Sequence, residues 1–515
     1  MKPLFYYTFI IIFIFCSCNR SSEQEKEPVN NGPEIKYIYA STGENTGVNV
    51  MYVGVEFDPH FFSQNVTRNA NPADWDIIVK RVTDMKVQSF RVMILPEWHE
   101  PVNDNNDPFV TDWDQFTFDS QEMQSLYKVL DLAQVNDIRV TLVLWGCAKN
   151  MRLLNPAYTH LKEHFLAEGN SYNNWVVAPK NMDEWCENFS VLVQYLLEFK
   201  KYTCVREITP MNEPSYAYNL DGTVSPASYV EMCKKLNARF IADNIRDKLL
   251  FNLSDDAENA QFLKTCTTEL SDVADLFNSH TYLFGYETPN TEIIQWEQNN
   301  RNLSEAAGKK HFVGEFGSNQ TVGSSRQKDI DLYQRGVLMT RIVLNLFNAG
   351  ASGVSYWSLL DQHYNKTGSY IEMQQLGLWR YKKADYSSEP YFSAIKGDYE
   401  PRPQYYAYSL LTNYILPGSE VYPIDLKENF VAGTAFKSEG GKYTYIFANG
   451  SEINICVGLE NKYLGVDDEF AVYKYIQGEL PNDDKVIQST ENLRTKDKKV
   501  EINLPALSVI VCQQK

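Results

Sequence analysis

The chain has 515 residues, of which 43% are hydrophobic, and a formal net charge of −18 at pH 7. The hydrophobic fraction is ordinary for a soluble globular protein, and the length is enough for a large core. The negative charge argues against polyanionic partners such as nucleic acid, because long-range repulsion opposes their approach, and it is compatible with a neutral substrate.

The first 18 residues have the pattern of a removed signal peptide. Lys2 precedes an apolar run over residues 4–15, which is too short to span a bilayer comfortably. The run leads into Ser17-Cys18, which resembles a bacterial lipobox. The resemblance implies lipid on the Cys18 thiol and an outer-membrane lipoprotein that faces the periplasm or the cell surface; an ordinary secretory signal is the alternative. Residues 19–47 are predicted to form a flexible tether, because their first half is polar and rich in Ser, Glu, Asn and Pro.

Residues 48–417 alternate short apolar runs with longer amphipathic segments. The predicted strands are 50–57, 88–94, 138–145, 206–211, 248–253, 274–279, 311–316 and 353–357. The predicted helices are 73–85, 120–136, 182–200, 226–246, 259–270, 291–307, 326–348 and 404–414. Several strands are almost continuously apolar, as parallel strands covered on both faces require. Eight strands that are each followed by a helix predict an α/β fold, a (β/α)₈ TIM barrel. A doubly wound open sheet is less favoured, because no Gly-x-Gly-x-x-Gly turn follows the first strand.

The pattern changes after Pro417-Gly418. Short alternating runs separated by Gly, Asn and Asp turns predict an antiparallel β-sandwich over residues 418–515. Within the barrel two connections are long, 146–181 and 358–402, and both carry aromatic residues. Both would leave the carboxyl ends of barrel strands, which is the face where barrel enzymes build their sites.

Two glutamates end predicted barrel strands. Glu213 lies in Asn212-Glu213-Pro214 at the end of the fourth strand, and Glu315 lies in Gly314-Glu315-Phe316 at the end of the seventh. Side chains at the carboxyl ends of barrel strands converge on one mouth, so the two carboxylates are expected to meet there. The alternative for the first motif is a helix start that is capped by Asn212.

These motifs resemble the clan A retaining glycoside hydrolases, and most closely glycoside hydrolase family 5, the cellulase and mannanase family. The resemblance implies that Glu213 is the acid/base and Glu315 the nucleophile. It also implies substrate-site roles for further residues near strand ends, namely Arg91, Asn212, His280, Tyr282, Trp357 and Trp145.

Each supporting residue has a role and an alternative. Arg91 would keep Glu315 ionised, since a nearby cation lowers the pKa of a carboxyl group, but it could also form a structural ion pair. Tyr282 would reach Glu315, and His280 would lie near Glu213 instead of being a satisfied core histidine. Trp357 would form the floor of a sugar subsite; the alternative is that it packs in the core.

The sequence departs from the family pattern at one place. Many family 5 enzymes have a histidine near the end of the third strand, where this chain has Leu144-Trp145-Gly146. Further carboxylates near strand ends are read as substrate contacts or solvated loop charges, namely Glu56, Asp58, Glu97, Glu100 and Asp361.

The implied reaction is a double displacement by two carboxyl groups about 5 to 5.5 Å apart. It needs neither a metal nor an organic cofactor, and the sequence has no His-Glu-x-x-His motif or calcium loop. The expected substrate is a neutral polysaccharide or oligosaccharide of glucan or mannan type. An exo-acting β-glycosidase of another clan A family is one alternative, and a non-catalytic glycan-binding lipoprotein is another.

Overall fold

The structure is a computed structural model. It describes residues 35–59, 72–101, 107–146, 178–179, 181–216, 223–320, 327–367, 370–386 and 395–515. The predicted signal peptide with Cys18 lies outside these residues, as does the first part of the predicted tether. No helix among the described residues combines the length and the apolar character that a bilayer crossing requires.

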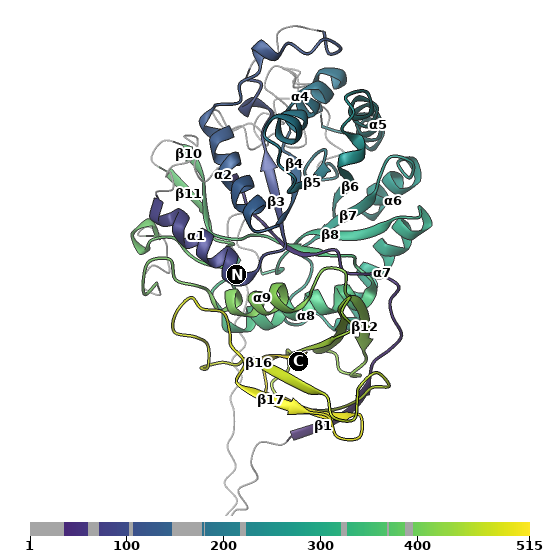
Figure 1. Cartoon of the computed structure of the whole chain (residues 1–515), viewed down its shortest axis with the longest axis vertical. Coiled ribbons are helices and arrows are strands. Elements are labelled where there is room, and N and C mark those ends of the chain that lie inside the picture. The colour runs from purple at the N-terminus through teal and green to yellow at the C-terminus, as the bar shows by residue number, and fades with distance from the viewer. Residues whose placement is uncertain are drawn as a thin grey trace, which may run out of the picture. The chain divides into compact units, whose positions relative to one another are not determined.

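Eight parallel strands close into a barrel, which confirms the predicted fold class (Figure 1). The barrel strands are β2 (Val53–Glu56), β3 (Ser89–Ile94), β4 (Arg139–Leu144), β5 (Val205–Thr209), β6 (Leu250–Ala257), β7 (Leu276–Thr281), β8 (Lys310–Phe316) and β9 (Val354–Tyr356). Each overlaps a strand predicted from the sequence. Their residues are almost all buried, because barrel side chains fill the interior on one face and the helices cover the other.

Helices follow the barrel strands in the predicted order. They are α1 (Pro72–Met85), α2 (Gln121–Val135), α4 (Met182–Gln194), α5 (Pro226–Ala242), α6 (Ala260–Glu269), α7 (Asn290–Ala306), α8 (Tyr333–Ala349) and α9 (Pro403–Tyr414). A π-helical turn, Tyr195–Phe199, extends α4. Short 3₁₀ turns are Pro96–Trp98, Trp113–Gln115, Arg246–Lys248 and Lys383–Tyr386. Several helices begin with side-chain caps; in α5, for example, Ser225 and Ser228 form a reciprocal capping box.

The C-terminal part forms two sheets that face each other. The six-stranded sheet contains β12 (Glu420–Ile424), β13 (Val431–Lys437), β14 (Tyr443–Asn449), β19 (Ser508–Gln514), β16 (Glu469–Tyr475) and β17 (Glu491–Arg494) in spatial order, all antiparallel. The second sheet contains β15 (Asn454–Glu460) and β18 (Lys499–Leu504). Apolar side chains from both sheets form one core, as in a β-sandwich.

The tether prediction is wrong for residues 35–41. These residues form β1 (Ile35–Ser41), which pairs in parallel with β15 at the edge of the second sheet. The alternation of the segment is weak, because only Ala40 is buried and Tyr37 and Tyr39 are exposed. The strand is held by backbone pairing to a partner more than 400 residues away, which local sequence does not reveal.

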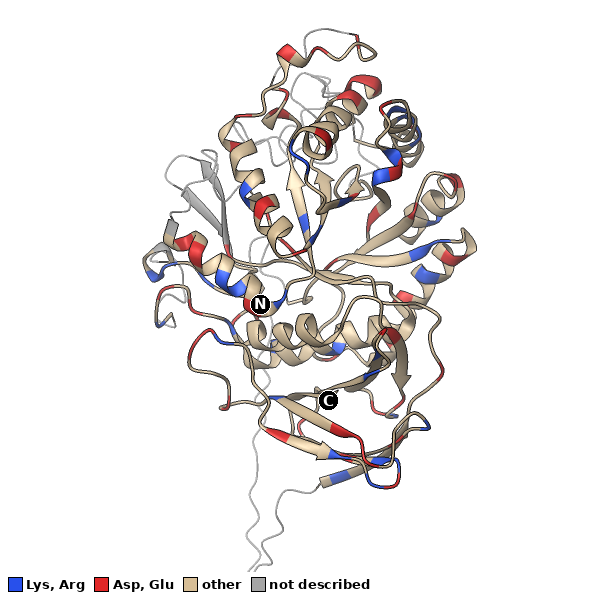
Figure 2. Cartoon of the chain, in the orientation of Figure 1, with Lys and Arg blue, Asp and Glu red and all other residues tan. Residues whose placement is uncertain are grey.

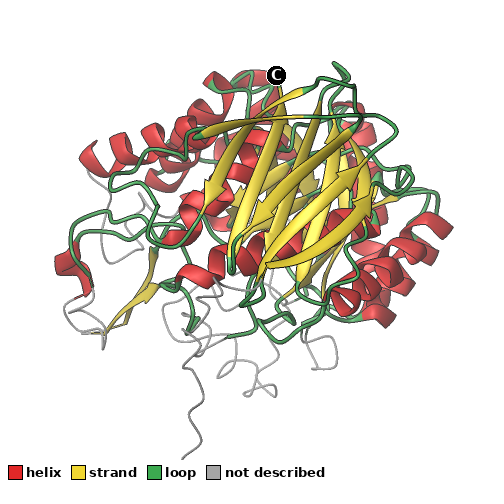
Figure 3. Cartoon of the chain, turned by 90° about the horizontal axis from the view of Figure 1, so that it is seen from below, coloured by secondary structure: helices red, strands yellow, loops and turns green. Residues whose placement is uncertain are grey.

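Helices α8 and α9 pack between the barrel and the six-stranded sheet. The period-2 alternation of β14 shows how: Tyr445 and Phe447 face the sandwich core, whereas Ile446 and Ala448 join the core of the barrel. Figure 2 shows α8 and α9 mostly in the colour of uncharged residues, in contrast to α4 and α5. Figure 3 shows the strands gathered at the centre with the helices around them. Residues 35–515 accordingly form one compact unit.

The second long connection, after β9, contains a hairpin of β10 (Gln362–Thr367) and β11 (Tyr370–Gln374). Most of the first long connection lies outside the described residues. Within the described part of the chain, six cysteines are free and buried, as small hydrophobic residues would be, namely Cys186, Cys204, Cys233, Cys266, Cys456 and Cys512.

Gly336 in α8 is expected to be intolerant of a side chain, because the contact with the sheet is tight. A Cβ atom there would lie 2.5 Å from Tyr475 Oη and 2.9 Å from Ala407 Cβ. Alanine gains about 1 kcal/mol in helix propensity, but overpacking costs about 1–3 kcal/mol or more, and the ring is also held by its hydrogen bond to Tyr333 O. We expect Gly336→Ala to lower the free energy of unfolding by about 1–2 kcal/mol in urea titrations. The matched control is Gly397→Ala, where nothing lies within 4 Å and no change beyond about 0.5 kcal/mol is expected.

Candidate active site

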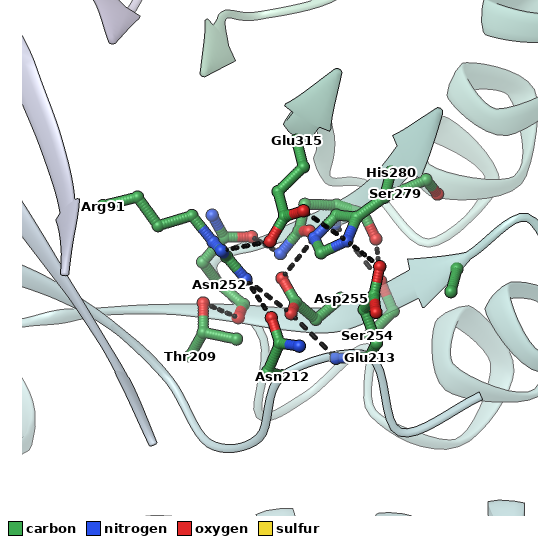
Figure 4. A network of polar contacts seen from close by, with 12 residues as sticks. Arg91, Thr209, Asn212, Glu213, Asn252, Ser254, Asp255, Ser279, His280 and Glu315 are labelled. Carbon is green, nitrogen blue, oxygen red and sulfur yellow. Dashed lines mark hydrogen bonds and ion pairs between the residues drawn. The ribbon is translucent and has the colours of Figure 1, made fainter. Parts of the chain in front are cut away.

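The two predicted catalytic glutamates lie at the same end of the barrel. Glu213 follows β5, and Glu315 lies near the end of β8. One carboxylate oxygen of each, together with one ring nitrogen of His280, forms a group whose atoms all lie within 4.8 Å of one another. Figure 4 shows His280 and Glu315 on neighbouring strands, with Glu213 approaching them from the segment after β5.

Glu213 is held by its backbone as well as its side chain. Its φ of 42° is in the left-handed region, which a non-glycine residue rarely occupies, and its N–H donates to Asp255 Oδ2 at 3.1 Å. Glu213 Oε1 lies 2.8 Å from His280 Nδ1. The side chain is 18% exposed, so it remains accessible from the barrel mouth.

Glu315 is more buried and is gripped by two donors. Arg91 Nη1 donates to Oε1 at 2.5 Å, and Tyr282 Oη donates to Oε2 at 2.9 Å. Burial raises the pKa of Glu315, whereas His280 and Arg91 oppose that rise and Glu213 adds to it, and the net direction is upward. Arg91 therefore acts in the predicted direction, but burial outweighs it.

Two glycines make room for this arrangement. A Cβ atom at Gly314 would lie 2.5 Å from Asn278 Oδ1 and 3.1 Å from His280 Nε2, and one at Gly317 would lie 2.7 Å from the Tyr282 ring. The β7–β8 ladder also shifts register between Ser279 and His280, which sets His280 opposite Glu315. Because Gly314 and Gly317 have no side chains, Glu315 can lie close to both His280 and Tyr282.

Arg91 on β3 is the cation of the site. Besides Glu315, its guanidinium donates to Asn212 Oδ1 at 2.8 Å and to Asp255 Oδ2 at 2.9 Å, and it lies 3.4 Å from Glu56 Oε2. Burial opposes its charge, but the surrounding carboxylates outweigh burial and raise the pKa of Arg91. It is therefore a permanent cation whose planar fork orients several groups at once.

His280, which lies on β7, contacts the carboxylates of Glu213, Glu315 and Asp255. Its Nδ1 faces Glu213, at 2.8 Å, and lies 3.7 Å from Glu315 Oε2, while its Nε2 faces Asp255 Oδ1 at 3.1 Å. Burial would lower the pKa of His280, but the charges of Asp255 and Glu315 outweigh it and raise that pKa well above its ordinary value.

The remaining predicted site residues lie on the same rim. Asn212 is buried and accepts from Arg91. Trp145 directly follows β4, and Trp357 directly follows β9, the strand next to β8; each is 8% exposed. The peptide bond between Trp357 and Ser358 is cis.

Sequence reasoning missed Asp255 and gave Glu56 only a secondary place. Asp255 is fully buried, and Arg91 and His280 together outweigh burial and hold its pKa well below the ordinary range. Its signal was an acidic pair, Asp255-Asp256, one residue beyond the predicted strand 248–253. Burial raises the pKa of Glu56 well above its ordinary value, although Arg91 opposes the rise.

Other acidic residues near strand ends have structural partners. Asp361 accepts from both Arg402 and Tyr386, and Glu100 accepts from Asn188. These contacts explain the burial of Asp361 and Glu100 without a role in chemistry.

Glu213, His280 and Glu315 are also residue types that bind metals. The Arg91 guanidinium 2.5 Å from Glu315 disfavours a second cation there by repulsion. The arrangement suits proton transfer and nucleophilic attack better than metal binding.

Tyr282→Phe is expected to lower the catalytic efficiency of the site without unfolding the protein. The variant removes only the hydroxyl that donates to Glu315 Oε2. A hydrogen bond to a charged group contributes about 1.5–3 kcal/mol, so kcat/KM should fall about 10- to 100-fold. Steady-state kinetics on an aryl glycoside would measure this. A variant as active as the wild type would show that the contact is irrelevant to turnover.

No protein-family model matches the sequence, and no curated protein sequence matches it. Solved structures do match the fold. The catalytic domain of the GH30 xylanase C from Talaromyces cellulolyticus matches with a TM-score of 0.63 and 12% identity, over 93% of this chain and 100% of that one. An α-L-arabinofuranosidase from Thermotoga maritima matches with a TM-score of 0.58 and 13% identity, over 93% and 99%. A glucosidase from Croceicoccus marinus matches with a TM-score of 0.59 and 10% identity, over 94% and 99%. At such identities the likeness shows a shared fold.

Proposed function

We propose that the chain is a retaining glycoside hydrolase that cleaves β-glycosidic bonds of a neutral polysaccharide or oligosaccharide. The observation that carries the proposal is the proximity of Glu213 and Glu315, which have carboxylate oxygens within 4.8 Å of each other at the barrel mouth. Retaining enzymes have carboxyl groups about 5–5.5 Å apart, whereas inverting enzymes need about 6.5–9.5 Å to admit a water. The fold likeness to a xylanase, an arabinofuranosidase and a glucosidase supports the same class.

In the proposed mechanism Glu315 attacks the anomeric carbon as Glu213 protonates the leaving oxygen. The covalent glycosyl-enzyme is then hydrolysed by a water from which Glu213 takes a proton. Arg91 and Tyr282 hold Glu315 in position for attack. Because Glu315 must be an anion and its pKa is raised, activity is lost as the pH falls through that raised pKa.

The family within the clan is also part of the proposal. The strand-end residues favour family 5, while a family 30 enzyme is among the structures with this fold. A glucan or mannan remains the expected substrate. The xylanase with this fold is a reason to include xylan, since the fold does not determine the sugar.

The test is a screen of the full mature protein against β-glucans, mannans, xyloglucan, xylan and 4-nitrophenyl glycosides. Reducing-end assays would detect turnover, and proton NMR of the first product would give its anomeric configuration. Retention at the anomeric carbon is expected; inversion would refute the mechanism. Products released as monosaccharides from the start would favour the exo-acting alternative. Glycan binding without turnover would favour the non-catalytic lipoprotein.

We further propose that Cys18 carries the lipid anchor and that the enzyme works at the outer membrane. The support is the lipobox-like Ser17-Cys18 after the apolar run. Metabolic labelling with a radioactive fatty acid is expected to mark the protein and to fail for Cys18→Ser. Equal labelling of that variant would contradict the anchor.

A further inference from the structure

One buried carboxylate of the site has no part in the double displacement. Asp255 lies near the end of β6, where the ladder with β7 shifts register between Leu253 and Asp256. Its Oδ2 accepts from Arg91 and from the backbone N–H of Glu213, and its Oδ1 faces His280 Nε2 (Figure 4). Asp255 therefore contacts a partner of each catalytic glutamate.

Asp255 acts on His280 only as an acceptor. Arg91 and His280 keep its pKa well below the ordinary range despite burial, so the carboxylate is ionised. An ionised carboxylate has no hydrogen to donate, and so the facing Nε2 of His280 carries one. The tautomer of the ring follows from this contact, because a neutral imidazole with a hydrogen on Nε2 has its lone pair on Nδ1.

The other ring nitrogen faces the acid/base residue. His280 Nδ1 and Glu213 Oε1 are 2.8 Å apart, which is the distance of a strong hydrogen bond. The proton shared by these two atoms can be bonded to either of them. Either the Glu213 carboxyl donates it to a neutral imidazole, or an imidazolium donates it to the Glu213 carboxylate. The two forms contain the same number of protons and differ only in the position of one.

We propose that Asp255 is a positioning residue for acid/base catalysis. By accepting the Nε2 hydrogen of His280 it keeps Nδ1 directed at Glu213, so that the His280–Glu213 pair stores the proton that the reaction uses. This inference rests on the proposed glycosidase function and deepens it.

The proton balance of the reaction follows directly. In the first step the stored proton passes through Glu213 to the leaving oxygen as the glycosidic bond breaks and the bond to Glu315 forms. The pair is then a neutral His280 and an ionised Glu213. In the second step water loses a proton to the pair, its oxygen bonds to the anomeric carbon, and the bond to Glu315 breaks. Asp255 keeps the same hydrogen bond to Nε2 throughout.

The charges around His280 determine the expected pH effect. The charged groups that face it are Asp255 on β6, Glu213 after β5 and Glu315 on β8. Farther away are Asp256 on β6, Glu258 and, on the other side of Glu315, Arg91 on β3. Removing the negative charge of Asp255 lowers the proton affinity of the pair. The stored proton is then lost at lower pH, and the alkaline limb of the kcat/KM profile moves down.

The first test uses Asp255→Asn, which keeps the size of the side chain and removes its charge. The alkaline limb of kcat/KM is expected to fall by about 1 to 3 pH units, the usual influence of a charge at this distance. We expect kcat/KM to drop about 10-fold or more on phenyl glycosides, whose leaving group needs a proton. On 2,4-dinitrophenyl glycosides, whose leaving group needs none, it should drop about 3-fold or less.

Asp256→Asn is the matched control. Asp256 is the adjacent residue, is also buried, and accepts from the backbone of Asn259 instead of from His280, although its charge acts on His280 from a distance. The leaving-group dependence of this variant should match the wild type, and its alkaline limb should move much less than that of Asp255→Asn, because Asp256 acts on His280 only from a distance. Equal losses on both substrate types in Asp255→Asn, or an unmoved alkaline limb, would overturn the proposal in favour of a purely structural counterion.

A second test needs no folded Asp255 variant and no substrate. Proton and nitrogen NMR of the wild type labelled with ¹⁵N-histidine would detect the ring hydrogens of His280, assigned by their loss in His280→Gln. Above the alkaline limb the hydrogen is expected on Nε2; a hydrogen on Nδ1 would refute the proposal. This result does not depend on turnover. An Nε2 hydrogen in a protein that cleaves no glycoside would therefore count against the proposed function alone.

Discussion

Replacing Glu315 with alanine is expected to lower kcat/KM by about 10⁴-fold or more, the order of loss when a covalent nucleophile is removed. The protein should remain folded, because Arg91 keeps its contacts with Asn212, Asp255 and Glu56. Added azide can enter the space that the carboxylate leaves and attack from that side. It should therefore restore turnover and give a glycosyl azide of inverted, α configuration, which proton NMR identifies.

Glu213→Ala is the matched variant with the opposite stereochemical outcome. Glu315 still forms the covalent intermediate, and azide then attacks from the side that Glu213 vacates. The product should be the β-glycosyl azide, with the largest loss of kcat/KM on substrates whose leaving group needs protonation, about 10²- to 10⁴-fold. The same azide configuration from both variants would contradict the division of roles between the two glutamates.

The second large effect is expected on stability. Arg91 is 4% exposed and faces several buried carboxylates, so Arg91→Met removes the guanidinium that compensates their charge. Removing one partner of a buried ion pair costs about 3–5 kcal/mol, and urea unfolding should show a loss of that size. As the pH falls, any folded fraction should lose activity at a higher pH than the wild type does. The reason is that Arg91 opposes the rise in the pKa of Glu315, so its loss raises that pKa further.

Arg206→Met is the control for this substitution. Arg206 pairs with Asp137 at the surface, where the two side chains are 47% and 88% exposed. Exposed pairs contribute little, so a change within about 0.5 kcal/mol is expected. If Arg91→Met were as stable as this control, the carboxylates around Arg91 would have to be neutralised by other means.

Local sequence was sufficient for most of the architecture. The barrel strands could be predicted because strands covered on both faces are largely apolar, and runs such as Val140–Leu144 are almost continuously so. The positions of Glu213 and Glu315 followed from their places at strand ends. Each of these features is written within a few neighbouring residues.

The features that sequence reasoning missed depend on distant partners. β1 was assigned to a tether because of the polar composition of the residues before it, and its pairing partner β15 begins only at Asn454. Asp255 was not selected from the sequence, because its place in the site depends on contacts with Arg91 and His280 from two other strands. The shift of register that directs Asp255 into the barrel also has no signature in the residues themselves.

By itself, then, the sequence determined the alternation of strand and helix, the closed barrel and the two glutamates at its carboxyl edge. The tertiary structure alone decided which side chains surround those glutamates and which groups have a raised or lowered pKa. It also decided how α8 and α9 join the barrel to the sandwich. The physical reason is range. Hydrophobic periodicity acts along the chain, whereas charge pairing and packing act through space between segments that only folding brings together.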